Sequence, residues 1–241
     1  MKILISNDDG INAPALKKLA TWAKKYGQVT VVAPKIEQSG KSHGIEIINS
    51  MEIKKVDLVE GVDAYYVDST PADCVRYGII GLKRDYDLVI SGINRGFNLG
   101  KDIVYSGTVG AVYESVGLGF KSLALSTAPN SLDIAMQSLD VIFDYFNKHK
   151  LFEKNKIYNV NIPESKPKGI RITRTGGGYY SDEFDCVGDC LFLQVGKMIW
   201  DDKNDMNLDT DAVMHGYISI TPLSCERTNV AVWETLRTLN D

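Results

Sequence analysis

The chain has 241 residues, of which 44% are hydrophobic and 24% are charged, and its formal net charge is −4 at neutral pH. This mildly acidic balance argues against a broad surface for a nucleic acid polymer, which requires an excess of Lys and Arg. No apolar run reaches the roughly 20 residues that span a bilayer, so no membrane association is expected. The N-terminus lacks the basic and apolar regions of a signal peptide, and this favours a cytoplasmic location.

Apolar runs alternate with amphipathic stretches from residue 2 to residue 148. The runs predict strands at residues 2–6, 28–34, 63–69, 86–92 and 121–127, and the stretches predict helices from Asn12 to Gly27 and over 70–79, 107–117 and 132–148. Asn12 and Thr70 are the expected N-caps of the first two helices. The strands are apolar throughout, as in a parallel sheet that is covered on both faces. We therefore expect an α/β fold: a Rossmann-like three-layer body with a mostly parallel sheet.

A different pattern begins after residue 150. Segments 156–163 and 169–175 predict strands, segment 209–223 predicts a short helix and a strand, and 227–239 predicts a closing helix. Residues 175–208 predict a projecting β-hairpin-like extension. Without a clear linker, we expect one domain over residues 1–241 that includes this extension. One acidic run in this half is interpreted as a solvent-exposed face, and it comprises Asp201, Asp202, Asp205, Asp209 and Asp211.

Oxygen-bearing side chains follow three of the predicted parallel strands. Loops at the carboxyl ends of such strands share one edge of the sheet, where ligands bind. These loops carry Asp8 and Asp9, then Ser39, and then Asn94, Asn98 and Ser106. Carboxylate, hydroxyl and amide oxygens suit Mg²⁺ or Mn²⁺ and not a structural zinc ion. A cation would also allow the adjacent Asp8 and Asp9 to stay ionised. The alternative is that "DDG" is only a polar turn.

The stretch "YSGTVGAVYES" places Ser106, Gly107 and Thr108 at the start of a helix. The free N–H groups and positive dipole end of a helix N-terminus bind phosphate. The alternative is an ordinary N-cap without a ligand. His43, in the second loop, is a candidate substrate contact, and an exposed turn histidine is the alternative. Neither a GxGxxG fingerprint nor a P-loop occurs.

Several motifs, spread in order over nearly the whole chain, resemble those of the SurE family, the survival-protein nucleotidases. They are "ILISNDDGINAPAL", "VVAP", "SGKS", "STPADCVRYGI", "DLVISGINRGFNLGKDIVYSGTVGA", "YNVNIP" and "DTDAVMHGYISITPL". The resemblance implies a metal-dependent phosphomonoesterase that hydrolyses nucleoside 5′- and 3′-monophosphates, with short polyphosphate as a further substrate of some members. It also implies homodimers or homotetramers in which a β-hairpin is exchanged between subunits, here residues 175–208.

The resemblance also implies roles for individual residues. One divalent cation per subunit, Mg²⁺ or Mn²⁺, would be bound by Asp8, Asp9, Ser39 and Asn94, and the catalytic residues would be Asn98 and Ser106. This chain departs from many relatives in the second loop, where those relatives carry a basic residue at the position of Glu37 or Gln38. That difference affects the expected substrate preference and not the metal.

Three other mechanisms or functions are compatible with parts of the pattern. Asp8 or Asp9 would act as a nucleophile in an aspartyl-phosphate mechanism, although the haloacid-dehalogenase pattern is Asp-x-Asp. A receiver-like signalling module would use Asp68 as its phospho-acceptor, but the chain is about twice too long and the strand ending at Thr127 has no terminal Lys. A dinucleotide-dependent oxidoreductase lacks its glycine fingerprint here.

Overall fold

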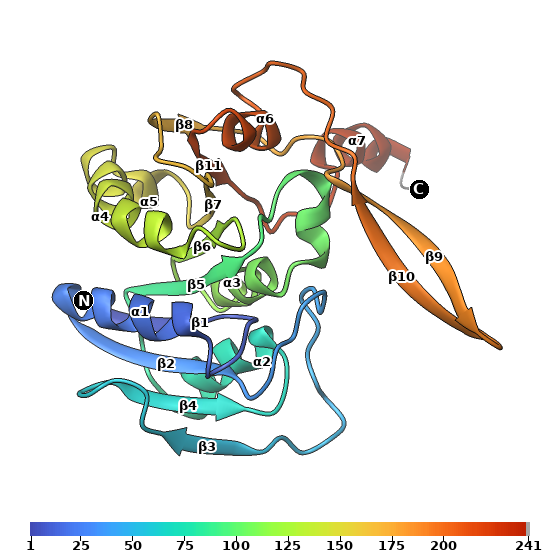
Figure 1. Cartoon of the computed structure of the whole chain (residues 1–241). Helices are drawn as coiled ribbons and strands as arrows, with labels where there is room; N and C mark the ends of the chain where they lie inside the picture. Colours follow the sequence, from blue (N-terminus) through green and yellow to red (C-terminus); the bar gives the residue numbers. More distant parts are fainter. Residues whose placement is uncertain (240–241) are drawn as a thin grey trace.

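The computed structural model describes residues 1–239, and a nine-stranded sheet forms its centre (Figure 1). The strand order across the sheet is β3-β4-β2-β1-β5-β6-β7-β11-β8. The strands are β1 Lys2–Ser6, β2 Gln28–Pro34, β3 Ile53–Val56, β4 Asp63–Val67, β5 Leu88–Arg95, β6 Ser122–Thr127, β7 Ile157–Ile162, β8 Ile170–Ile172 and β11 Ile218–Pro222. From β4 to β7 across the sheet, all five pairs of adjacent strands are parallel, which confirms the mostly parallel sheet.

Helices cover both faces of this sheet, so the expected three layers are present. Ile3 and Ile5 pack with α1 (Pro14–Ala23) and α4 (Leu132–Lys148), whereas Leu4 packs on the opposite face with α2 (Pro71–Arg76). α3 (Gly107–Gly117) lies on that second face as well. Successive residues of a strand point to opposite faces, so a strand covered on both sides must be apolar throughout.

The predicted helix starts agree with the structure at two of three positions. Thr70 caps α2 by accepting a hydrogen bond from Asp73 N, and Ser106 caps α3 by accepting one from Val109 N. The prediction for Asn12 is wrong, because α1 begins after Ala13 and has no side-chain cap. The Asn7 side chain organises that turn instead: its Oδ1 accepts from Gly10 N at 3.2 Å and its Nδ2 donates to Gly10 O at 3.0 Å.

The outer strands of the sheet were not fully predicted. β3 pairs antiparallel with β4 at one edge, and β11 pairs antiparallel with β7 near the other. The strand expected at 169–175 is only the short β8, which pairs parallel with β11. The helical segments described after residue 150 are α5 (Leu151–Lys154), α6 (Asp209–Met214), α7 (Val230–Leu236) and a 3₁₀ turn at Arg237–Leu239. In the part of the chain described, no helix is both long and apolar enough to cross a bilayer.

The predicted hairpin is present as a separate two-stranded antiparallel sheet, β9 (Tyr180–Gly188) and β10 (Leu191–Met198). Figure 1 shows it projecting from the body as a long arm. Almost all of its side chains are exposed. The assignment of residues 1–241 to a single domain stays a prediction.

The acidic run before the last strand is only partly a solvent-exposed face. Asp201 and Asp202 are exposed, as expected, but Asp209 and Asp211 are fully buried. Asp209 accepts hydrogen bonds from backbone N–H groups, and Asp211 accepts one from Trp200 Nε1 at 2.9 Å. Both are structural residues that pair with donors of neighbouring segments.

Candidate active site

The carboxyl edge of the sheet carries a pocket of about 380 Å³. The turn after β1, the loop after β2 and the segment at the end of β5 form its inner wall, so the parallel topology brings together residues that are far apart in sequence. Six of the predicted site residues line it: Asp8, Asp9, Ser39, Asn94, Asn98 and Ser106.

Asp8 and Asp9 line the pocket in a poorly solvated environment. Burial raises the pKa of Asp8 to about 6; the adjacent Asp9 adds to this effect, while a hydrogen bond from Thr108 opposes it. That bond joins Thr108 Oγ1 to Asp8 Oδ1 at 2.6 Å. Burial also raises the pKa of Asp9, opposed mainly by Arg95, whose Nε lies 3.5 Å from Asp9 Oδ1. The protein groups around Asp8 and Asp9 therefore do not fully compensate the negative charge of the two carboxylates.

The donor set of this pocket fits a divalent cation. Asp9 Oδ2 is buried without a hydrogen-bond partner among the described residues, and the Asp9 side chain is only 6% exposed. Asn94 is anchored through Nδ2, which donates to Gly96 O at 2.9 Å, so its carbonyl oxygen is the free end. Ser39 Oγ donates its proton to Glu37 Oε1 at 2.8 Å, which leaves its lone pairs for a ligand. Hard oxygen donors of this kind bind Mg²⁺ or Mn²⁺.

Only two of these four donors are carboxylates. Residues 1–239 accordingly contain no cluster of three or more His, Cys, Asp and Glu side chains arranged as a metal site. A cation bound here would keep part of its coordination for water and substrate oxygens, as Mg²⁺ does in sites for phosphate substrates.

Asn98 and Ser106 are held rigidly at the pocket wall. Asn98 Nδ2 donates to Ser126 Oγ at 2.8 Å, and Asn98 O accepts from the side chains of Asn159 and Asn161, each at 2.8 Å. Ser106 Oγ accepts from Val109 N at 3.1 Å, so its own proton is available to a ligand. Both residues therefore present polar groups to the pocket without a need for rearrangement.

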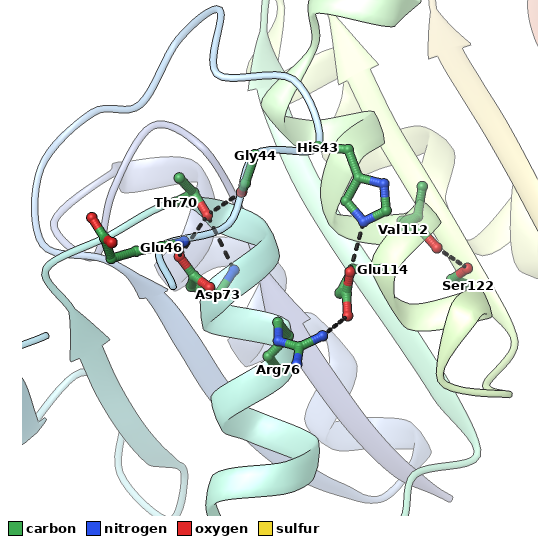
Figure 2. Close-up of polar contacts among 9 residues, drawn as sticks. All are labelled: His43, Gly44, Glu46, Thr70, Asp73, Arg76, Val112, Glu114 and Ser122. Carbon is green, nitrogen blue, oxygen red and sulfur yellow. Dashed lines mark hydrogen bonds and ion pairs between the residues drawn. The ribbon is translucent and has the colours of Figure 1, made fainter. Parts of the chain in front are cut away.

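The other predicted phosphate contacts lie outside the pocket lining. Gly107 and Thr108 start α3 directly behind Asp8, and a Cβ atom on Gly107 would come within 3.1 Å of Asp8 Cβ. The Thr108 hydroxyl is engaged with Asp8. His43 does not line the pocket either; Figure 2 shows its ring turned toward Glu114. Asp68, the candidate phospho-acceptor, forms an ion pair with Lys35 at 3.0 Å on the surface.

Other pocket residues were not identified from the sequence as site residues. Arg95 directly follows Asn94, and its position in the same motif was the available signal. The hairpin contributes Tyr180, Asp182 and Gln194, which only the tertiary structure reveals. Asp102 connects the segment Gly100–Tyr105 to the start of the hairpin, because its Oδ2 accepts hydrogen bonds from both Tyr179 N and Tyr180 N at 2.8 Å. The remaining unpredicted lining residues are Glu37, Gly40, Phe97, Asp102 and Tyr105.

A doubly wound sheet with paired carboxylates at its carboxyl edge and a helix N-terminus beside them defines an α/β protein that binds its ligand outside the ends of the parallel strands. Comparison with known proteins identifies the family within this class. The family model described as "Survival protein SurE" matches residues 3–182. The chain belongs to the SurE family.

Full-length relatives and a solved structure agree with this assignment. The chain is 40% identical over 235 residues to a 5′-nucleotidase SurE of Petrotoga mobilis, with 93% of each chain covered. It is 37% identical over 238 residues to a 5′/3′-nucleotidase SurE of Yersinia enterocolitica, which covers 95% of this chain and 93% of that one. The crystal structure of the SurE protein from Aquifex aeolicus superimposes with a TM-score of 0.82 at 33% identity and full coverage of both chains.

Proposed function

We propose that this protein is a metal-dependent phosphomonoesterase that hydrolyses nucleoside 5′- and 3′-monophosphates to a nucleoside and phosphate. The observation that carries the proposal is one pocket that combines Asp8, Asp9, Ser39 and Asn94 with a buried carboxylate oxygen that has no hydrogen-bond partner within residues 1–239. Relatives named as 5′- and 5′/3′-nucleotidases support the same reaction. We also propose short polyphosphate as a further substrate of the same hydrolysis.

One divalent cation per subunit, Mg²⁺ or Mn²⁺, would be bound by these four residues. Such an ion supplies Lewis-acid stabilisation of the charge that develops on the phosphoryl oxygens. The residues of the chain itself position the substrate and the attacking water and provide polar groups around them. A water held by Asp8 or Asp9 would attack phosphorus in line with the leaving nucleoside oxygen. Asn98 and Ser106 would hold the equatorial oxygens, together with the positive end of α3, as phosphoryl transfer requires.

The pocket is suited to a nucleoside. Phe97, Tyr105 and Tyr180 line it, and the last two are 62% and 49% exposed. Exposed aromatic rings beside a phosphate site provide faces on which a base can stack. Asp182 and Gln194 of the hairpin line the same pocket and offer hydrogen-bonding groups to the base or the ribose.

A phosphate-release screen over nucleoside monophosphates and polyphosphate tests the proposal. We expect multiple turnovers with Mg²⁺ or Mn²⁺, a loss of at least about 100-fold in EDTA, and recovery when the metal is added back. Turnover that is unaffected by EDTA would contradict the metal-dependent mechanism. Hydroxylamine trapping separates the alternative with an Asp nucleophile, because only that route forms an aspartyl-phosphate.

We also propose that the chain forms a homodimer or homotetramer through its hairpin and C-terminal helix. The hairpin exposes Phe184 (67%) and Phe192 (62%), and α7 exposes Trp233 (50%) and Leu236 (53%). Apolar groups gathered on a projecting element are typical of an interface between subunits. The register of β9 and β10 places Phe184 and Phe192 on the same face of the hairpin.

Light scattering coupled to size-exclusion chromatography measures the assembly. We expect two or four times the mass of one chain, and a shift to the monomer when Phe184→Asp and Phe192→Asp are combined, because the charges would have to be buried. Lys148→Asp, on the far end of α4, is the control and should not change the assembly. A native chain that elutes as a monomer at micromolar concentration would refute the proposal.

A further inference from the structure

The loop that carries Ser39 is not held in place by burial. Residues 36–50, called here the Ser39 loop, contain only half-buried and exposed side chains, including Ile47 and Ile48, which are 81% and 87% exposed. Burial of apolar surface is the main force that fixes most segments. The position of Ser39 must therefore depend on polar contacts.

Those contacts form anchors on both sides of Ser39. On one side, Gln38 N donates to Asp8 O at 2.8 Å. On the other side, Ser42 bonds to the 3₁₀ segment Gly100–Tyr105, with Ser42 N donating to Tyr105 O at 3.0 Å. Ser42 is only three positions after Ser39, which limits the separation of their Cα atoms to about 11 Å.

A third anchor follows immediately at His43. His43 Nε2 lies 2.7 Å from Glu114 Oε2, and Arg76 Nη1 donates to Glu114 Oε1 at 2.7 Å (Figure 2). Glu114 lies on α3 and Arg76 at the end of α2, so this network, called here the Glu114 network, ties the Ser39 loop to two helices. The His43 ring also stacks beside Tyr113, with the ring centroids 6.3 Å apart.

The electrostatics of Glu114 make this anchor effective. Its side chain is only 11% exposed. The hydrogen bond from His43 and then that from Arg76 lower the pKa of Glu114 against the opposing effect of burial, so the carboxylate is charged near neutral pH. Hydrogen bonds to a charged acceptor are about twice as strong as neutral ones.

The loop also lies too close to α3 to shift inward. A Cβ atom on Gly110 would come within 2.1 Å of Ser42 O and 3.0 Å of His43 Cα. Glycine at this position of α3 allows the backbone of the loop to rest on the helix. Thr70 Oγ1 and Asp73 Oδ2 secure the next turn by bonding to Gly44 O at 2.7 Å and Glu46 N at 2.9 Å (Figure 2).

We propose that the Glu114 network positions Ser39 beside Asp8 and Asp9, so that the oxygen donors of the pocket are assembled before the cation binds. His43 and Glu114 are positioning residues in this arrangement, and His43 acts through Glu114 and not on the substrate. The inference rests on the proposed metal site. It predicts that residues outside the pocket control metal affinity, because partners behind the ligands commonly contribute 10- to 100-fold to it.

Mn²⁺ binding to the free protein, followed by electron paramagnetic resonance without substrate, tests this inference. We expect His43→Ala to weaken Mn²⁺ binding about tenfold. His43→Gln, whose terminal N–H can replace Nε2, should restore most of the affinity. His215→Ala is the matched control, because His215 forms a similar pair with Asp202 at 2.9 Å outside the pocket; its affinity should be native.

A double-mutant cycle decides whether His43 acts through Glu114. Contacting residues are coupled, so Glu114→Ala and His43→Ala together should cost no more affinity than Glu114→Ala alone. Glu114→Gln serves the same cycle if the alanine variant does not fold. Additive losses, or a native Mn²⁺ affinity in His43→Ala accompanied only by weaker inhibition by inorganic phosphate, would overturn the inference and make His43 a substrate contact.

Limited proteolysis supplies a second readout. Lys41 is exposed in the middle of the Ser39 loop, and a released loop should be cut there by trypsin several-fold faster in His43→Ala than in the native chain or His215→Ala. Equal cleavage in all three proteins would contradict the positioning role. A native chain that binds no Mn²⁺ would instead refute the proposed metal site, so the two failures are distinguishable.

Discussion

Asp8→Asn is expected to lower kcat/KM for a nucleoside monophosphate by about 1,000-fold or more. The substitution keeps the shape of the side chain and removes the charge of one of only two carboxylates in the cation site. Stabilisation of a phosphoryl transition state by a bound cation contributes several kcal/mol, and each 1.36 kcal/mol corresponds to a tenfold change in rate. Steady-state phosphate release at saturating Mn²⁺ measures the effect.

The fold should survive this change. Burial already raises the pKa of Asp8 to about 6, so the site tolerates a neutral side chain, and the amide oxygen can still accept from Thr108 Oγ1. Circular dichroism should show native secondary structure, while Mn²⁺ should no longer raise the melting temperature. Asp133→Asn, at an exposed carboxylate paired with Lys18, is the control and should keep full activity. Wild-type turnover in a folded Asp8→Asn protein would end the metal-site assignment.

The central part of the fold was predictable because its local and global signals agree. Ile3, Leu4 and Ile5 form a continuous apolar run, and the structure shows why: alternate residues pack into two different cores. β3 was missed because its sequence, Ile53-Lys54-Lys55-Val56, is that of an exposed edge strand with charged residues. The antiparallel orientation of β11 depends on tertiary packing, which no local pattern records.

The inner wall of the site was predictable for a topological reason. Parallel strands end at one edge, so Asp8, Ser39 and Asn94 had to approach one another if the strands were assigned correctly. The hairpin wall with Tyr180 and Gln194 was not predictable, because its contact with the pocket depends on long-range bonds to Asp102.

Asp209 is a residue whose burial cannot be predicted from the composition of its segment. Five aspartates within eleven residues resemble a solvated surface, yet Asp209 is buried among backbone donors from three segments. Its Oδ2 accepts from Gly100 N at 3.0 Å, and its Oδ1 accepts from Gly176 N at 2.7 Å and Thr210 N at 2.8 Å. Burial raises its pKa, while these bonds oppose the effect. The side chain thus joins the segment beside the pocket to the base of the hairpin.

Asp209→Ala is expected to reduce the free energy of unfolding by about 3–5 kcal/mol. The substitution leaves three buried backbone N–H donors without their partner, and each unsatisfied buried donor costs about 1–3 kcal/mol. Relief of the buried charge offsets part of the total. Relaxation is restricted at Gly100, which has φ +59° and whose added Cβ would lie 2.0 Å from Gly177 O. Since 1 kcal/mol corresponds to about 2–4 °C for a protein of this size, the melting temperature should fall by roughly 10 °C.

Two further variants make this prediction specific. Asp209→Asn removes the charge but turns an amide N–H toward one backbone donor, so its loss should be about 1–3 kcal/mol and smaller than that of the alanine variant. Asp202→Ala, in the same acidic run but exposed, should change stability by less than about 0.5 kcal/mol. Urea unfolding of the three variants at pH 7 gives the ranking. Equal stabilities for Asp209→Ala and Asp202→Ala would show that the buried bonds of Asp209 do not hold the start of the hairpin to the body.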